Sequence, residues 1–182
     1  MTPSHLLLQR IIWAALLVAT LLYLVVALVI ELPPFEEPVP AFLPLPLALG
    51  AVVMLVVGLV LPPRLVRPRL LALGLPVTEL APDAALFADR PGRRRRFTDP
   101  AAARQRAIPA MNVALLLPLA LAESIAIFGM LLLLLGFGAA LSLPFFLVAW
   151  GFMLVRFPTA RRLEHVLEAA YDADLVAPDA AG

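Results

Sequence analysis

Glu123 is the one acidic residue that lies inside a long apolar segment of this chain. It follows Met111, where that segment begins, by 12 residues, which is about 18 Å along a helix and close to the middle of a bilayer. An ionised carboxylate at that depth costs about 2.5–3.5 kcal/mol on insertion scales, so the protonated acid is favoured. Three roles fit such a carboxyl group: a hydrogen bond that holds helices together, a proton carrier, or a contact with a partner protein or cofactor.

Several polar side chains are spaced to accompany Glu123. Ser124 follows it directly, and Asn112 lies eleven residues earlier, within about 20° of the same helix face. In the first apolar segment, Thr20 lies at a matching depth and Tyr23 lies one turn further along. We therefore expect a hydrogen bond from Thr20 or Tyr23 to Glu123.

The basic side chains predict contact with anionic lipid headgroups. Ten arginines and four acids lie within residues 62–110, and each basic residue near an anionic leaflet contributes about 1 kcal/mol. The alternative is that these arginines only anchor the topology. Nucleic acid is not an expected partner, because no aromatic residue other than Phe97 accompanies the run Arg93–Arg96. The residues predicted to contact lipid are Arg93, Arg94, Arg95, Arg96, Arg104 and Arg106.

The residue types present exclude several kinds of site. The chain has no Cys, which removes thiolate metal sites, and all 14 basic residues are Arg, which removes lysine Schiff-base chemistry. Glu164, His165 and Glu168 lie close together, but such residues on an exposed helix are more often solvated than bound to a metal. The apolar segments hold no nucleophile–base pair and no axial ligand for a haem. We expect no catalytic residue, metal or cofactor.

The composition predicts an all-α integral membrane protein. Of 182 residues, 63% are hydrophobic and 15% are charged, and the mean hydropathy is +0.98. Soluble domains are nearer 45–50% apolar and about 25% charged. Segments long enough to cross a bilayer cover residues 11–30, 41–61, 111–135 and 139–155.

Charge bias orients these four segments. The acidic segment 31–40 is expected outside and the Arg-rich segment inside, so both termini of this inner-membrane protein are expected in the cytoplasm. A cleaved signal peptide is less well supported than a retained first helix, because its apolar core is long and lacks a small-residue cleavage site. The predicted parts are a first transmembrane hairpin (1–61), an Arg-rich cytoplasmic loop (62–106), a second hairpin (107–157) and a cytoplasmic tail (158–182).

Two local patterns predict helices outside the apolar segments. Asp99 followed by Pro100 is typical of a helix start, with Asp99 as the capping residue. Within residues 158–176, apolar side chains recur at helical spacing, which predicts an amphipathic helix on the membrane surface or against a partner. Residues 62–106 show no apolar periodicity long enough for a domain.

The segment 122–129, with sequence AESIAIFG, resembles the ion-carrying helix of rotary ATP synthase c subunits. The resemblance implies that Glu123 carries the ion and that Ser124 supplies the hydroxyl found in sodium-type rings. Over most of its length, the chain is similar to a group of small bacterial four-helix membrane proteins. This similarity implies a four-helix fold, but these proteins have no assigned activity. That similarity rests on the arginines before Glu123 and on the segment Arg156-Phe157-Pro158-Thr159.

These observations favour a small non-catalytic polytopic protein, an accessory or assembly subunit of a membrane complex. In this interpretation Glu123 pins helix packing or meets a partner. Its partners are the bilayer, anionic lipid headgroups, and either another membrane protein or further copies of the chain. The alternative is a proton-translocating protein similar to a c subunit, with Glu123 as the carrier.

Overall fold

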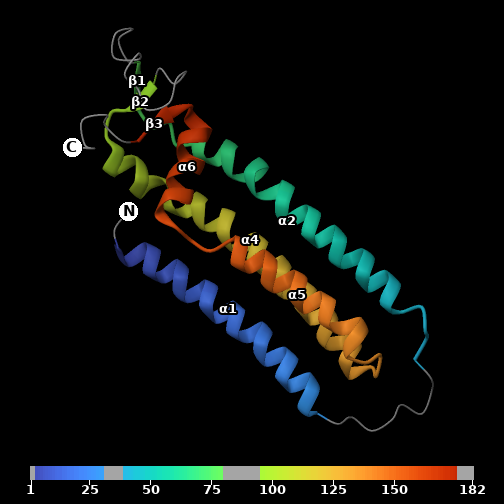
Figure 1. The fold of residues 1–182 in the computed structure, drawn as a ribbon. Coiled ribbons are helices and arrows are strands. Elements are labelled where there is room, and N and C mark those ends of the chain that lie inside the picture. Colours follow the sequence, from blue (N-terminus) through green and yellow to red (C-terminus); the bar gives the residue numbers. More distant parts are fainter. Residues whose placement is uncertain (1–2, 31–38, 80–94, 176–182) are drawn as a thin grey trace. The chain divides into compact units, whose positions relative to one another are not determined.

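The computed structural model describes residues 3–30, 39–79 and 95–175, and these are mostly helical (Figure 1). The helices are α1 (Pro3–Val29), α2 (Pro44–Ala72), α4 (Pro100–Leu134), α5 (Ala139–Val155) and α6 (Ala160–Tyr171). Three short strands accompany them: β1 (Val77–Glu79), β2 (Arg95–Phe97) and β3 (Ala173–Asp174).

The chain divides into two compact units. The helical unit comprises Leu7–Pro62 and Leu115–Phe157, and the mixed unit comprises Met1–Leu6, Pro63–Ala114 and Pro158–Gly182. Helices α1, α2 and α4 each contribute residues to both units. Each unit is described by itself below.

The helical unit is built from long apolar helices around α4. Residues of α4 at helical spacing are buried, among them Leu119, Ala122 and Ala126, whereas the other helices keep many large apolar side chains exposed. Large apolar surfaces exposed along several long helices are the pattern of helices that face lipid. Three helices, α1, α2 and α4, are long and apolar enough to cross a membrane, and α5 with α6, if taken as one bent span, would be a fourth.

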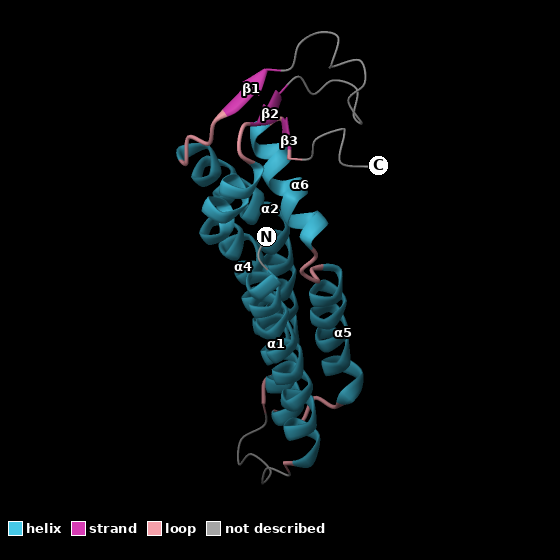
Figure 2. Ribbon diagram, turned by 90° about the vertical axis from the view of Figure 1, so that its left-hand side faces the viewer, coloured by secondary structure: helices cyan, strands magenta, loops and turns pink. Residues whose placement is uncertain are grey.

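The mixed unit combines helix ends with a small sheet of order β1-β2-β3 (Figure 2). Strand β2 pairs antiparallel with β1, Val77 facing Phe97, and parallel with β3, Arg95 facing Ala173. The core joins three separate parts of the sequence. Its largest fully buried side chains are Leu70, Phe97, Met111, Leu167 and Leu175.

The structure corrects the interpretation of residues 62–106 as a loop. Helix α2 continues to Ala72, two strands follow, and α4 already begins at Pro100. The all-α expectation holds only in the coarser sense that the described residues are mostly helical. The apolar runs in residues 62–106 are too short to indicate a core by themselves. They form a core only together with residues of α4 and α6.

Both local helix predictions are confirmed. The Asp99 carboxylate accepts a hydrogen bond from the Ala102 amide at 2.9 Å, which caps the start of α4. Helix α6 forms within the predicted range 158–176 but ends at Tyr171, and the following residues form β3. The Thr159 hydroxyl caps the start of α6 by accepting from the Arg162 amide. However, its apolar face packs on the core of the mixed unit through Leu163 and Leu167. That face is therefore covered by the chain itself, where a membrane surface or partner was expected.

Candidate functional site

The Glu123 carboxylate forms a hydrogen bond with Tyr23 in the helical unit. The Tyr23 hydroxyl of α1 donates to Oε1 of Glu123 on α4 at a distance of 2.7 Å. A carboxyl in an apolar helix needs such a donor, because an unsatisfied polar group in hydrocarbon costs several kcal/mol. The expected contact from α1 to Glu123 is therefore present, and Tyr23 provides it.

Thr20 joins a different pair of helices. Its side chain is fully buried, at 0% exposure. The hydroxyl donates to the Leu17 carbonyl at 2.8 Å and accepts from Nε1 of Trp150 at 3.0 Å, so it links α1 with α5. No residue near Trp150 in the sequence indicates which hydroxyl its indole N–H reaches. The Tyr23 and Thr20 side chains therefore each join α1 to a neighbouring helix.

The other predicted companions of Glu123 are not gathered around it. The Ser124 hydroxyl donates to the Ala120 carbonyl of its own helix at 3.0 Å, a back-bond common for serine in apolar helices. Asn112 is half-buried and belongs to the mixed unit. In the helical unit, the predicted cluster thus reduces to the pair formed by Tyr23 and Glu123.

The residues next to Glu123 pack closely within the chain. Ala122, Ile125 and Ala126 are almost fully buried. One turn and a half beyond Glu123, α4 approaches α5 at Gly129, where an added Cβ would lie 2.8 Å from the Phe146 ring. Small residues at helix contacts allow such approach in membranes, where packing rather than the hydrophobic effect drives association. The segment 122–129 thus contacts α1 through Glu123, α2 through Phe128 and α5 through Gly129.

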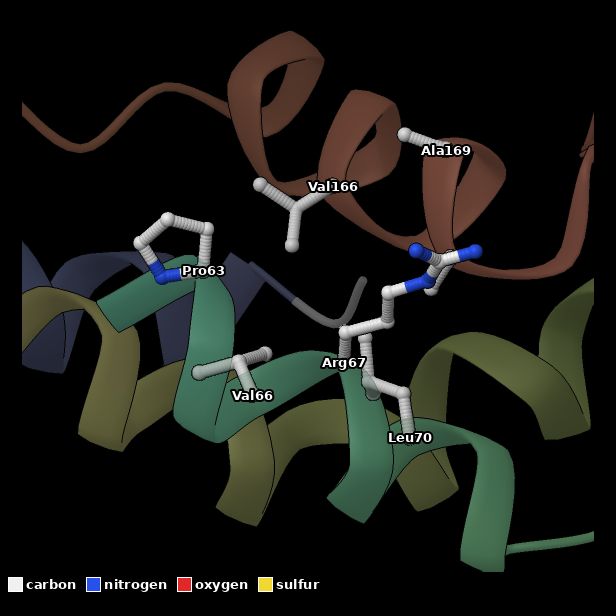
Figure 3. A pocket seen from close by; sticks show the side chains of 7 residues that line it. Pro63, Val66, Arg67, Leu70, Val166 and Ala169 are labelled. Atoms are coloured by element: carbon white, nitrogen blue, oxygen red, sulfur yellow. The ribbon is translucent and has the colours of Figure 1, made fainter. Parts of the chain in front are cut away.

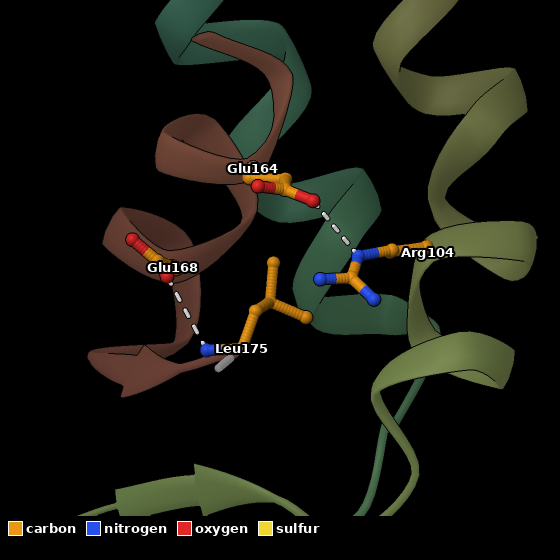
Figure 4. Close-up of polar contacts among 4 residues, drawn as sticks. All are labelled: Arg104, Glu164, Glu168 and Leu175. Carbon is orange, nitrogen blue, oxygen red and sulfur yellow. Dashed lines mark hydrogen bonds and ion pairs between the residues drawn. The ribbon is translucent and has the colours of Figure 1, made fainter. Parts of the chain in front are cut away.

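Two of the arginines expected at lipid headgroups form ion pairs in the mixed unit. Nε of Arg104 donates to Oε1 of Glu164 at 2.9 Å, and the side chains are 25% and 28% exposed (Figure 4). Arg95 lies 3.7 Å from Glu79, in a pair that is far more exposed. Arg96 is half-buried and Arg106 is exposed. Arg93 and Arg94 lie outside the described residues.

The acidic side chains of α6 form contacts that hold the mixed unit together. Glu164 binds Arg104, and Oε1 of Glu168 accepts from the Leu175 amide at 3.2 Å, which holds the chain that follows α6 (Figure 4). Within the described residues, no three His, Asp or Glu side chains are grouped so that they could hold a metal ion.

Tyr171, at the end of α6, has a structural role. The sequence indicates it only as one of the apolar positions that recur within residues 158–176. Its hydroxyl donates to the Leu70 carbonyl and accepts from the Leu75 amide at 3.2 Å. Its ring meets Phe97 edge to face, with centroids 5.3 Å apart. The end of α2 leaves carbonyls without partners in its own helix, and the phenol satisfies one of them.

Chemically, the residues of the helical unit that the structure describes offer the Glu123 carboxyl with the Tyr23 phenol as its donor. Such an arrangement can hold two helices together or hold a proton. No protein-family model, no curated protein and no solved structure matches this chain.

Proposed function

We propose that this chain is a small, non-catalytic multi-pass protein of the bacterial inner membrane, an accessory or assembly subunit of a membrane complex. In this proposal the contact between Tyr23 and Glu123 holds α1 against α4. Four spans form two hairpins, and both termini are cytoplasmic. Helix α5 has 17 residues, which is about 25 Å of helix and the lower limit for a span.

The observation that carries the proposal is the 2.7 Å hydrogen bond from Tyr23 to Glu123. It gives one oxygen of the Glu123 carboxyl a partner within the chain, which supports a structural role for this acid. The neighbouring small residues of α4 are covered by the same chain rather than left open for further copies. Both features support a packing role over the proton-carrying role implied by the resemblance to c subunits.

The first test compares two substitutions of Glu123 in the purified protein in detergent. Glu123→Gln keeps both a donor and an acceptor, so the melting temperature should stay close to that of the parent. Glu123→Leu removes the interhelical hydrogen bond and should cost about 0.6–1.7 kcal/mol. Tyr23→Phe should reproduce that loss, and Ser124→Ala is the matched control, because its hydroxyl bonds only its own helix.

A measurement of proton flux in liposomes separates the two roles of Glu123. A packing residue gives no flux in the parent protein and none in Glu123→Gln. Flux in the parent that Glu123→Gln abolishes, with an unchanged melting temperature, would establish the proton carrier and overturn the packing role.

Native mass spectrometry of the protein released from its host membrane tests the accessory role. A fixed ratio with other subunits supports it, and their identity would supply the process served. A ring made only of many copies of this chain would contradict it.

A further inference from the structure

The mixed unit contains a groove between the last turns of α2 and helix α6 (Figure 3). Its volume is about 300 Å³. Its walls are apolar, with Pro63, Val66 and Leu70 on α2 and Val166 and Ala170 on α6. Val66 and Leu70 are also core residues, so this wall is held rigidly by the packing beneath it.

Arg67 is the one charged residue among those that line the groove. Its side chain extends from α2 towards α6, so the guanidinium group lies along the apolar walls (Figure 3). Among the described residues, no acid is within ion-pair distance of Arg67, in contrast to Arg104 and Arg95. The groove therefore presents an available cation beside apolar surface.

The position of Arg67 along α2 matches the level of lipid headgroups. It follows the apolar segment 41–61 by six residues in one continuous helix, a rise of about 9 Å. The polar layer on each side of the hydrocarbon core is about 5–8 Å thick, and a long arginine side chain reaches further to place its charge there. Arg64 and Arg69 flank this level on the same helix.

We propose that the groove binds the headgroup end of one anionic phospholipid. The guanidinium of Arg67 pairs with the lipid phosphate, for which its planar fork of donors is suited. The glycerol and first methylene groups pack on Pro63, which is exposed, and Val166, which is half-buried. A zwitterionic lipid carries its own ammonium group, which competes with Arg67 for the phosphate, so an anionic headgroup binds more tightly. This site rests on the membrane location proposed above, but it uses none of the residues around Glu123.

The test counts lipids bound to the purified protein by native mass spectrometry. Phosphatidylglycerol and phosphatidylcholine with identical acyl chains are added in separate titrations. The parent protein should retain one phosphatidylglycerol at lower concentration than phosphatidylcholine. Arg67→Gln should weaken phosphatidylglycerol binding about tenfold, since a charge-assisted hydrogen bond is lost. Arg69→Gln removes the same charge from the same helix outside the groove and should change binding less than twofold.

A second variant fills the groove and leaves its charge in place. Ala169→Trp alters an exposed position of α6 that lines the groove, so the fold should tolerate it, as an unchanged melting temperature would show. It should reduce phosphatidylglycerol binding as much as Arg67→Gln. Equal losses in Arg67→Gln and Arg69→Gln, or full binding by Ala169→Trp, would show general surface attraction and overturn the site.

Two further experiments test for a free-phosphate site and for the membrane location. Inorganic phosphate at millimolar concentration should not displace the lipid, and displacement would identify a free-phosphate site instead. Fractionation of host cells tests the membrane location independently. Protein found in the membrane fraction that shows no lipid preference would overturn the groove site and leave the proposed function standing.

Discussion

The helical unit and the mixed unit differ in how their polar side chains find hydrogen-bond and ion-pair partners. In the described part of the helical unit, polar side chains join neighbouring helices in isolated contacts, as in the pairs Tyr23–Glu123 and Thr20–Trp150. In the mixed unit, polar contacts surround a compact apolar core, and ion pairs and a tyrosine hydroxyl connect its segments. The difference follows from the expected surroundings, because an apolar solvent penalises every unpaired polar group and water does not.

The comparison also shows where stability comes from. Side chains in the mixed unit are buried against one another, so their removal from water stabilises the fold. Helices that face lipid gain little from burying apolar side chains and depend on close packing and interhelical hydrogen bonds. The same kind of substitution should therefore have unequal effects in the two units.

The largest expected effect is the loss of a core aromatic residue in the mixed unit. Phe97 is 1% exposed and contacts Tyr171, so Phe97→Ala should destabilise this unit by about 3–5 kcal/mol. Hydrogen exchange should show lost protection in residues 63–79 and 160–175, with α1 and α5 still protected. Phe42, which is 70% exposed in the helical unit, is the control, since Phe42→Ala should change stability by less than about 0.5 kcal/mol. Equal effects of the two substitutions would remove the distinction between the units.

A smaller effect is expected at the close contact between α4 and α5. At Gly129 a new Cβ would lie 2.8 Å from Phe146 and 3.0 Å from the Cβ of Phe145, so Gly129→Ala should cost about 1–3 kcal/mol by overpacking. Gly151→Ala is the matched control, because a Cβ there meets nothing within 4 Å, and it should be neutral or stabilising by up to about 1 kcal/mol. Thermal unfolding in detergent measures both. A neutral Gly129→Ala would mean that this contact is not tight.

The smallest effect is expected from the ion pairs of the mixed unit. A double-mutant cycle on Arg104 and Glu164, whose side chains are about a quarter exposed, should give a coupling of about 1 kcal/mol or less. The longer and more exposed pair of Arg95 with Glu79 should give a coupling near zero. Raising the salt concentration should weaken the first coupling only modestly and abolish any trace of the second. A stronger coupling at Arg95 would contradict this order.

Parts of the fold that depend on nearby residues could be predicted. The helix starts at Asp99 and Thr159 follow from side chains that reach amides three residues away. The contact to Glu123 could be narrowed to two hydroxyl groups on α1, because depth along a helix follows from residue number. The choice between Thr20 and Tyr23 could not be made, since it depends on where Trp150 of α5 lies.

The sheet and the core of the mixed unit could not be predicted for a related reason. Strand β3 has two residues and β1 and β2 have three each, so no alternation of apolar and polar residues is long enough to indicate them. The charge of Arg104 is visible in the sequence, and it predicted a contact with lipid headgroups. Its ion pair with Glu164 could not be predicted, because the two residues lie 60 positions apart. The groove with Arg67 exists only because α6 packs beside α2.

By itself, the sequence determined that the chain forms long apolar helices and that a single carboxyl lies among them. Apolar length and charge are properties of contiguous residues, and hydrocarbon selects for both. Only the tertiary structure decided that Tyr23 donates a hydrogen bond to that carboxyl and that Tyr171 donates one to a carbonyl at the end of α2. It also decided that three separate segments share one core. Those contacts join residues about a hundred positions apart, and their energy comes from packing and hydrogen bonds that no local pattern records.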